Sequence, residues 1–333
     1  MRSELRLPLD QVNRGHPRPV HCAPRTIGHL AEPANRSSCP MRVPLALLLP
    51  LLSLAAPAAP ATPSLWDREN LAAWCIVPFD ALKRSPVERA QMLRELGLTK
   101  LAYDFREEHV PAFADEIRAT RAQGIEIVAW WFPTELDATA RQILETVARH
   151  GLRPQLWVSG WDSEATRRLS HEERLRHEVD RIRRLATAAH RVGCRVGLYN
   201  HGGWFGEPEH QMQVIERLRA EGISHVGIVY NFHHGHDHID RFPALWPRIQ
   251  PHVMAVNLNG MVRGGDRIGR KIVPVGDGDA EADMMRIIED SGWRGLVGIL
   301  NHQEEVDARH GLARNLAGLA RLTAPAPTPN AQD

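Results

Sequence analysis

Histidine and asparagine recur at two equivalent points of the sequence, each directly after a short apolar run. One run is followed by Tyr199, Asn200 and His201, and the next is followed by Asn231 and, three residues on, His234. Imidazole takes up and releases protons near neutral pH, and an amide can both donate hydrogen bonds to hydroxyl groups and accept them. The repeat therefore predicts a site that moves protons on a hydroxylated small molecule.

The segment between the two clusters indicates how the chain positions them. Residues 209–221 carry apolar side chains at Met212, Ile215 and Leu218, the spacing of a helix with one buried face. Strand, helix and strand form the repeating unit of a parallel α/β sheet, in which ligands bind at the carboxyl ends of the strands. A single histidine in a loop is usually solvated, but matched clusters at two equivalent strand ends favour a functional site.

The same alternation of strand and helix runs through the rest of the chain. The expected strands cover residues 73–77, 100–103, 125–130, 155–158, 195–198, 225–229, 253–256 and 296–300. The expected helices cover residues 86–96, 111–123, 137–150, 170–193, 209–221, 242–249, 280–290 and 304–322. Eight such units in about 250 residues predict an α/β protein, a single (β/α)8 TIM barrel over residues 70–322. A doubly wound sheet is the competing architecture, but the even spacing and the lack of a GxGxxG motif after the first strand argue against it.

The two ends of the chain differ from the part between them. Residues 1–40 are rich in Arg, Pro, Ser and His without periodicity, and we interpret them as an extension that is either not translated or disordered. Residues 41–61 have a positive start, a short apolar run and small residues, which predicts a signal peptide and export to the periplasm or the medium, with no membrane span after cleavage. A disordered segment with an internal apolar stretch, or a membrane-associated stub, is the alternative. Residues 323–333 are expected to be a disordered tail.

Composition excludes some partners and some chemistry. The formal net charge of +1 favours no polyanionic partner, so nucleic-acid binding is not expected, and 43% apolar residues suffice for a full core. Cys75 and Cys194 lie in apolar runs and are expected to be small buried side chains. The sequence has no Cys-x-x-Cys spacing for a zinc or redox site.

All strand ends of such a barrel meet at one mouth, where the predicted site must lie. Tryptophan is frequent there and stacks on the apolar faces of sugar rings, although some of these tryptophans are expected to pack between barrel and helices instead. Asparagine is also frequent and suits hydroxyl recognition, whereas carboxylates are few. We assign catalysis to His201, His234 and Asp104, and substrate binding to Asn200, Asn231, Asn257, Trp131, Trp161, Trp204, Arg106 and His302.

Several segments resemble a known family. Residues 197–203 (GLYNHGG) resemble the fifth-strand motif of the sugar phosphate isomerase/epimerase families, the xylose isomerase-like TIM barrels, in which Glu-Asn-His-Gly-Gly is common. Residues 231–234 (NFHH) are similar to their sixth-strand Asp-x-x-His, and residues 253–259 to their seventh-strand segment. The resemblance covers residues 73–322 and implies a TIM barrel that isomerises or epimerises sugars.

The resemblance also implies a metal, and here the sequence departs from the family. The family holds a divalent ion with two Glu, one Asp and one His, and hard cations need such oxygen ligands. Uncharged side chains stand where the resemblance places the acidic and imidazole residues of these motifs: Tyr199, Asn231, Asn257, Asn259 and Asn301. His201 and His234 are the residues of the motif that remain as metal ligands. Whether a divalent metal binds therefore stays an open question, since its usual carboxylate ligands are missing. Asp104, His233 and His302 are the residues that could rebuild a histidine-rich site.

Two functions from different classes follow. The first is an exported sugar isomerase/epimerase-like enzyme that acts on a sugar or sugar derivative by histidine-mediated proton transfer, with a lyase reaction also open. The second is a barrel that binds carbohydrate without turning it over, because loss of the ligand carboxylates would leave its Trp and Asn lining in place. Glycoside hydrolysis needs two carboxylates that flank one bond, and it ranks last because only Asp80 and Asp104 offer such a pair.

Overall fold

The computed structural model describes residues 64–160 and 162–324. The expected extension (1–40) and signal peptide (41–61) lie outside the described residues, as do Trp161 and all but two residues of the expected tail. No helix in the described ranges is both long and apolar enough to cross a membrane.

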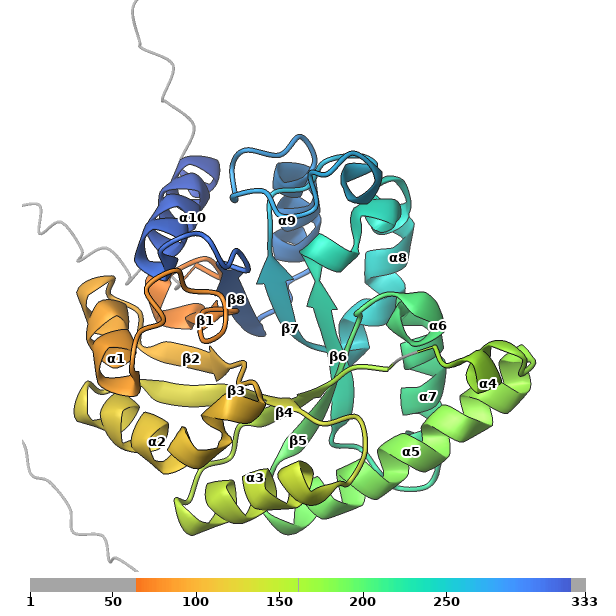
Figure 1. Cartoon of the computed structure of the whole chain (residues 1–333). Helices are drawn as coiled ribbons and strands as arrows, with labels where there is room; N and C mark the ends of the chain where they lie inside the picture. Colours follow the sequence, from red (N-terminus) through yellow and green to blue (C-terminus); the bar gives the residue numbers. More distant parts are fainter. Residues whose placement is uncertain (1–63, 161, 325–333) are drawn as a thin grey trace, which may run out of the picture. The chain divides into compact units, whose positions relative to one another are not determined.

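Eight parallel strands close into a barrel in the order of the sequence (Figure 1), each paired with the next and the last paired with the first. This closure confirms the predicted (β/α)8 barrel and excludes a doubly wound sheet, whose edges stay open. The strands are β1 (Leu71–Trp74), β2 (Lys100–Tyr103), β3 (Glu126–Phe132), β4 (Gln155–Val158), β5 (Arg195–Tyr199), β6 (Val226–Asn231), β7 (Val253–Leu258) and β8 (Leu296–Leu300).

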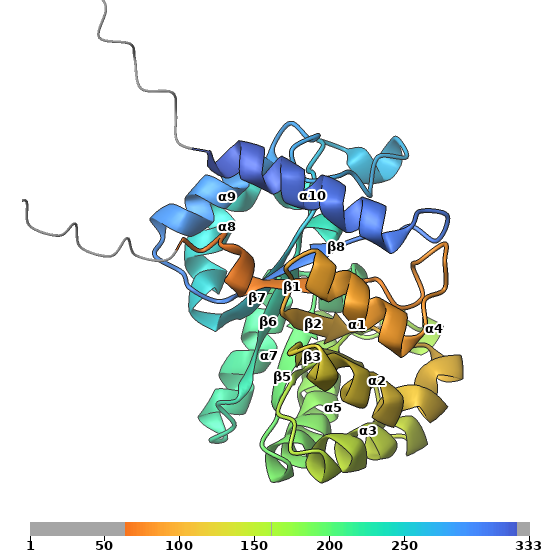
Figure 2. The ribbon, with the colours of Figure 1, turned by 90° about the vertical axis from the view of Figure 1, so that its left-hand side faces the viewer.

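Helices surround the strands, and in both views α1 and α10 lie side by side (Figures 1 and 2), where Arg309 forms an ion pair with Glu95 at 2.5 Å. The α-helices are α1 (Pro86–Glu95), α2 (Phe113–Ala122), α3 (Ala138–Arg149), α4 (Glu164–Arg167), α5 (His171–Arg191), α6 (Gly203–Gly206), α7 (Pro208–Ala220), α8 (Phe242–Ile249), α9 (Glu281–Asp290) and α10 (Ala308–Thr323). Short 3-10 helices add η1 (Arg68–Asn70), η2 (Glu107–Ala112), η3 (Phe232–His234), η4 (His236–Arg241), η5 (Gln250–His252) and η6 (Gly265–Arg267).

Local sequence signals set several helix ends. Ser170 accepts a hydrogen bond from the Glu173 main-chain N–H while the Glu173 side chain accepts from Ser170, which is the capping box expected at the start of α5. Gly193, which follows the same helix, has φ +75°, a left-handed conformation that glycine adopts at little cost. The long charged helix therefore begins and ends where its sequence predicts.

Some element boundaries differ from the prediction. The first strand covers Leu71–Trp74 rather than residues 73–77, because Cys75 has φ +53° and leaves the extended conformation. The last helix begins at Ala308 rather than residue 304, because Asp307 caps it by accepting from the Arg309 N–H at 2.8 Å. The pattern of apolar residues around these positions did not indicate either boundary.

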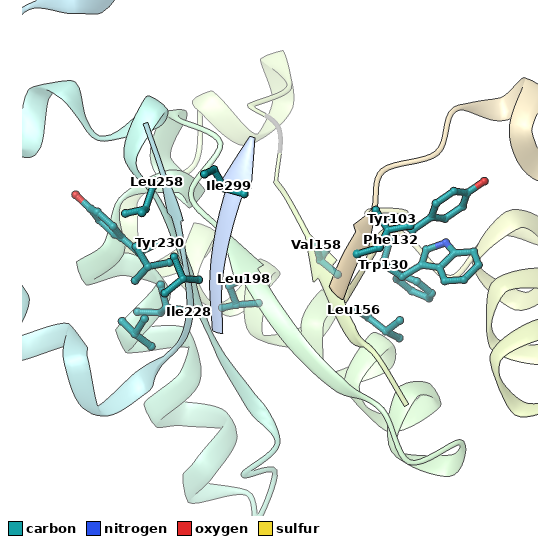
Figure 3. Close-up of a cluster of buried hydrophobic side chains, with 14 of the residues drawn as sticks. Tyr103, Trp130, Phe132, Leu156, Val158, Leu198, Ile228, Tyr230, Leu258 and Ile299 are labelled. Carbon is teal, nitrogen blue, oxygen red and sulfur yellow. The ribbon is translucent and has the colours of Figure 1, made fainter. Parts of the chain in front are cut away.

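The outward faces of the strands form an apolar layer beneath the helices. Figure 3 shows Tyr103 and Trp130 extending from one part of the barrel wall and Ile228 and Tyr230 from another. Trp130 packs edge-on against Phe113 of α2, with 5.0 Å between the ring centroids. This tryptophan therefore packs the barrel against its helices and does not reach the barrel interior.

The barrel interior combines small and large residues. A Cβ atom added at Gly197 would lie 2.5 Å from a methyl group of Val229 and 3.0 Å from the ring of Trp157, so this wall position must stay small. Ala102 and Ala129 are likewise small and fully buried in the interior cluster. These positions leave room for the large aromatic side chains that fill the barrel below its mouth.

Candidate active site

Three aromatic side chains close the barrel interior below its mouth, and we call them the aromatic floor: Trp74, Trp131 and Tyr199. The Tyr199 ring centroid lies 5.9 Å from that of Trp74 and 5.1 Å from that of Trp131. The Trp74 indole N–H donates to the Tyr199 hydroxyl at 3.1 Å, and the Asn231 amide donates to the same oxygen. Burial raises the pKa of Tyr199 well above its usual value, so the floor is uncharged.

Four imidazoles lie above the floor, and we call them the histidine cluster: His201, His233, His234 and His302. They follow β5, β6 and β8, so three strand ends bring them together. The ring centroids of His201 and His234 are 4.4 Å apart, those of His233 and His234 4.0 Å, and those of His233 and His302 4.9 Å. His233 is fully buried, and neither of its ring nitrogens has a hydrogen-bond partner in the described structure.

The histidine cluster is held in its neutral form. Burial, together with the neighbouring positive charges, lowers the pKa of His234 to about 2 and that of His302 to about 4. Burial is also the largest cause of the lowered pKa values of His201 and His233. At neutral pH the four rings are therefore uncharged imidazoles, which can both donate and accept hydrogen bonds.

Asp104 is the acidic residue that reaches this pocket. It follows β2, is 2% exposed, and its Oδ1 accepts from the main-chain N–H groups of Ile76 at 3.3 Å and Val77 at 3.2 Å. Its Oδ2 has no hydrogen-bond partner among the described residues. Burial raises the pKa of Asp104 to about 7, against the lowering influence of Arg106, so the carboxyl group exchanges protons near neutral pH.

The aromatic floor, the histidine cluster and Asp104 enclose a cavity of about 50 Å³. Because β2 lies across the closed barrel from β6, Asp104 faces the His233–His234 pair from the other side of the mouth. The cavity is lined by Trp74, Cys75, Phe79, Asp104, Arg106, Trp131, Tyr199, His201, His233, His234 and His302.

Cys75 and His302 form an unusual pair at the edge of the cavity. The His302 Nδ1 lies 3.2 Å from the Cys75 sulfur, and the His302 main-chain N–H donates to the Cys75 carbonyl at 3.1 Å. Both residues have left-handed backbones, with φ +53° at Cys75 and φ +52° at His302, a conformation that costs energy for residues other than glycine. Burial raises the pKa of Cys75 well above its usual value, so the sulfur is a thiol.

Six of the residues assigned from sequence line the cavity: His201, His234, Asp104, Trp131, Arg106 and His302. Asn200 lies elsewhere, since its amide group bonds to the main chain of Asn231, accepting from N–H at 2.7 Å and donating to the carbonyl at 3.2 Å. Asn231 supports the floor through Tyr199, and Asn257 lies beside the same hydroxyl. All three asparagines are fully buried, so their role as substrate ligands stays a prediction.

Trp204 lies outside the cavity lining, and Trp161 is outside the described residues. The Trp204 ring stacks on His210 with 4.4 Å between centroids, and its indole N–H donates to the His171 Nδ1 at 3.3 Å. This rim cluster joins α5, α6 and α7.

Asp80 does not supply a second carboxylate for glycoside hydrolysis. Its oxygens accept from the Arg84 guanidinium at 2.8 Å and from the Ala308 N–H at 3.1 Å, and these hydrogen bonds hold its pKa below the usual value despite its burial. Asp80 is absent from the cavity lining. Its role is to join the loop after β1 to the start of α10.

The side chains at this site do not fit the divalent ion held by carboxylates that the family resemblance implies. The Tyr199 hydroxyl is engaged in the floor, and the Asn301 amide donates to the Phe79 carbonyl at 2.7 Å, away from the imidazoles. Asn259 is used in the same way, accepting from the Val273 N–H at 3.2 Å. Over residues 64–160 and 162–324, no group of three or more His, Cys, Asp or Glu side chains is arranged to hold a metal ion.

Five cavity residues were not assigned to catalysis or substrate binding from sequence: Trp74, Cys75, Phe79, Tyr199 and His233, of which His233 was named only as a residue that could rebuild a metal site. The alternation of side chains along a strand points to one of them. If His201 faces the pocket, Tyr199 two residues before it faces the barrel interior and Asn200 between them does not. Trp74 and Cys75 carried no such signal, because the expected first strand ended three residues too late.

A closed parallel barrel with its pocket at the strand ends is the architecture in which ligands bind at the carboxyl face. The chain belongs to the xylose isomerase-like TIM barrel family, whose model matches residues 80–321. This match confirms the resemblance found in the sequence. A search of curated protein sequences finds no match to the chain.

Solved structures with the same fold include sugar epimerases. One is the 3-keto-D-glucoside 4-epimerase of E. coli, with 15% identity, a TM-score of 0.57, and coverage of 76% of this chain and 98% of that one. A D-psicose 3-epimerase crystallised with D-fructose has 14% identity, a TM-score of 0.51, and coverage of 72% and 93%. The IOLI protein, crystallised with a zinc atom, has 13% identity, a TM-score of 0.58, and coverage of 76% and 97%. At these identities the similarity shows the shared fold.

Proposed function

We propose that this protein is an isomerase or epimerase that moves a proton on a carbon atom of a sugar or sugar derivative. The observation that carries the proposal is Asp104, a buried carboxyl group with a pKa of about 7 and a free Oδ2 at a cavity lined by neutral imidazoles. A general acid–base group works best when its pKa is close to the pH of the reaction. Family membership and the sugar epimerases of the same fold support a sugar as the substrate.

In this proposal the carbon that reacts lies between Asp104 and the histidine cluster. Asp104 takes a proton from a carbon next to a carbonyl group, and the bonding electron pair moves to the carbonyl oxygen as an enolate. His201 and His234, across the mouth, donate hydrogen bonds to that oxygen and exchange protons with it. In an isomerisation the enolate oxygen takes up a proton, the hydroxyl group on the deprotonated carbon gives up its proton and becomes the new carbonyl group, and the former carbonyl carbon receives the proton. In an epimerisation the proton returns to the other face of the same carbon.

The aromatic floor supplies the binding surface in this proposal. Trp131 and Trp74 present apolar rings to the cavity, and the C–H groups at the reacting end of a sugar pack on such rings. We also propose that the protein works outside the cytoplasm, because residues 41–61 have the sequence features of a signal peptide.

Hydrogen exchange with heavy water tests the proposed chemistry. Sugars and keto-sugars incubated with the protein should gain deuterium at one carbon, detected by NMR or mass spectrometry. His201→Ala and His234→Ala should each slow this exchange by about two to four orders of magnitude. His310→Ala is the matched control, because His310 is exposed on α10 and should leave the rate unchanged.

The competing function is carbohydrate binding without turnover. Tryptophan fluorescence separates the two, because sugar binding at the aromatic floor should quench it in either case. Fluorescence quenching without deuterium incorporation across a broad panel of sugars would contradict the proposed enzyme and show a carbohydrate-binding protein.

A further inference from the structure

We propose that the substrate of this pocket carries a carboxylate group, and that Arg106 and Lys271 hold it at the barrel mouth. The ligand class is a sugar acid rather than a neutral sugar. This inference rests on the proposed function for the location of the reacting carbon, and it adds the chemical class of the molecule that enters.

Arg106 stands at the edge of the cavity with part of its guanidinium group available. Its Nη1 donates to the main-chain carbonyls of Asp104 at 3.1 Å and Phe105 at 2.9 Å, and its guanidinium lies 5.3 Å from the Phe79 ring centroid. These contacts fix the side chain without neutralising it. Within the described residues its Nε and Nη2 donate no hydrogen bond, and a carboxylate matches one edge of a guanidinium with two hydrogen bonds.

Lys271 is placed on the same side of the barrel by its main chain. Its carbonyl accepts from the Asn259 amide at 2.9 Å and lies 3.0 Å from His236 Nε2, which tethers the segment after η6 to the end of β7. Its ammonium is close enough to contribute to the lowered pKa values of all four rings of the histidine cluster. Its positive charge therefore acts on the pocket, although Lys271 is not among the residues that line the cavity.

The charges of the pocket do not balance. Neither Arg106 nor Lys271 forms an ion pair within the described residues, whereas the buried Arg89 next to the barrel pairs with Glu116. The histidine cluster is neutral, and Asp104 is the acidic residue among those that line the cavity. Two cations against one carboxyl group that is only partly ionised at pH 7 leave an excess of positive charge, which the carboxylate of a sugar acid offsets.

The sizes of two neighbouring cavities place the carboxylate at the entrance. The histidine-lined cavity has a volume of about 50 Å³, which holds the reacting end of a sugar but not a whole ring with its substituents. Arg106 also lines a second cavity of about 570 Å³, together with residues of α1 and η2. A ligand held by Arg106 can therefore direct its reacting carbon inward while its charged end stays at the border of the two cavities.

The proposal has a consequence for protons as well as for affinity. Arg106 is the largest of the influences that oppose burial in setting the pKa of Asp104. A bound carboxylate offsets that positive charge, so the pKa of Asp104 rises on binding. At pH 7, where Asp104 is partly ionised, binding of a sugar acid should therefore take up protons, and binding of a neutral sugar should not.

Isothermal titration calorimetry on the full chain tests this with matched pairs of probes. The probes are D-glucuronate with D-glucose, D-galacturonate with D-galactose, and D-gluconate with D-glucitol, each titrated at pH 7 in two buffers of different ionisation enthalpy. At least one acid should bind tenfold or more tightly than its neutral partner, with proton uptake. Arg106→Gln and Lys271→Gln should each weaken that binding about ten- to a hundredfold.

Arg270→Gln is the matched control, because Arg270 is the exposed neighbour of Lys271 and bonds instead to the Asp277 carbonyl at 3.4 Å. It should leave the affinity for the acid unchanged. Equal affinity for every acid and its neutral partner, or equal loss of acid binding in Arg270→Gln, would overturn the inference. Tighter binding of glucose 6-phosphate than of any carboxylate would overturn it in favour of a phosphate ligand.

Turnover separates this inference from the proposed function. If a sugar acid binds with proton uptake but gains no deuterium, the result supports the carboxylate site and contradicts the proposed reaction. Deuterium incorporation into neutral sugars alone supports the reaction and removes the carboxylate site.

Discussion

Asp104 combines features that oppose each other in a folded protein: it is buried, yet one of its oxygens has no partner in the described structure. Its contacts with two main-chain N–H groups stabilise the charged form only in part, and burial keeps its pKa at about 7. Such a group is costly to maintain for stability alone. Its position at the cavity indicates that this cost in stability serves the function of the site.

Replacing this carboxyl group should remove the chemistry. Asp104→Asn keeps the size of the side chain but cannot take up a proton, so deuterium exchange should fall by about two to four orders of magnitude. In the wild type, the rate should rise with pH through about 7 as the base ionises. A pH profile that is flat between pH 5 and 8 would assign the base to another residue.

The same residue should make stability depend on pH. Because the folded pKa of Asp104 is raised above its unfolded value, its favourable contribution is complete below pH 4 and is lost as pH rises through about 7. Asp104→Asn removes this dependence, so the variant should gain stability relative to the wild type as pH rises from 4 to 8. Urea unfolding at a series of pH values measures the difference, and Asp162→Asn at the partly exposed rim is the control.

At the scale of single residues, side-chain alternation decides what a sequence motif contributes. Asn200 and His201 are neighbours in one motif, yet His201 lines the cavity and Asn200 bonds to the next strand. Trp130 and Trp131 divide in the same way, with Trp130 against α2 and Trp131 in the floor. The alternation of side chains along a strand, applied backwards from His201, would have predicted that Asn200 points away from the cavity. The opposite orientations of Trp130 and Trp131 could be assigned only once the register of β3 was known.

The elements follow their sequence signals closely where local chemistry sets them. The strands β2, β4 and β8 and the helix α8 have the predicted bounds, and the capping box starts α5 as expected. Differences occur where contacts distant in sequence decide the conformation. The end of β1 is one example, since it depends on the hydrogen bond from His302 to Cys75, which are 227 residues apart.

The capping box of α5 should carry measurable stability. Ser170→Ala removes the side-chain oxygen that accepts from the Glu173 N–H, so the free energy of unfolding should fall by about 1 kcal/mol. Thr187→Ala, at an exposed position inside the same helix, should change it by less than about 0.5 kcal/mol. Equal losses in the two variants would show that the cap is not the cause.

For the whole molecule, uncharged ligand positions predict weak metal binding. Protein purified without chelator should carry less than one divalent ion per chain by elemental analysis, because Asn231 and Asn257 stand where the family has anionic or imidazole ligands. One tightly held ion per chain that is lost in His234→Ala would instead show a rebuilt histidine site.

Export is also a property of the whole chain. A protein expressed from Met41 should be found outside the cytoplasm and should be cleaved after Ala59 or Ala61, because small residues follow the apolar run there. N-terminal sequencing of the mature protein provides the measurement. A mature protein that begins near Met1 would contradict both the proposed start and the signal peptide.

Cys75, which with His302 forms the pair of left-handed residues at the cavity edge, also provides a site for covalent labelling. The Cys75 thiol is only 3% exposed and its raised pKa keeps the reactive thiolate scarce, so general alkylating reagents should modify it slowly. A haloacetyl group attached to a molecule that occupies the pocket would meet the sulfur at high effective concentration. In protein expressed from Met41, which lacks Cys22 and Cys39, labelling of Cys75 with Cys194 left unmodified would be measured as one mass increment per chain and would report which ligands occupy the pocket.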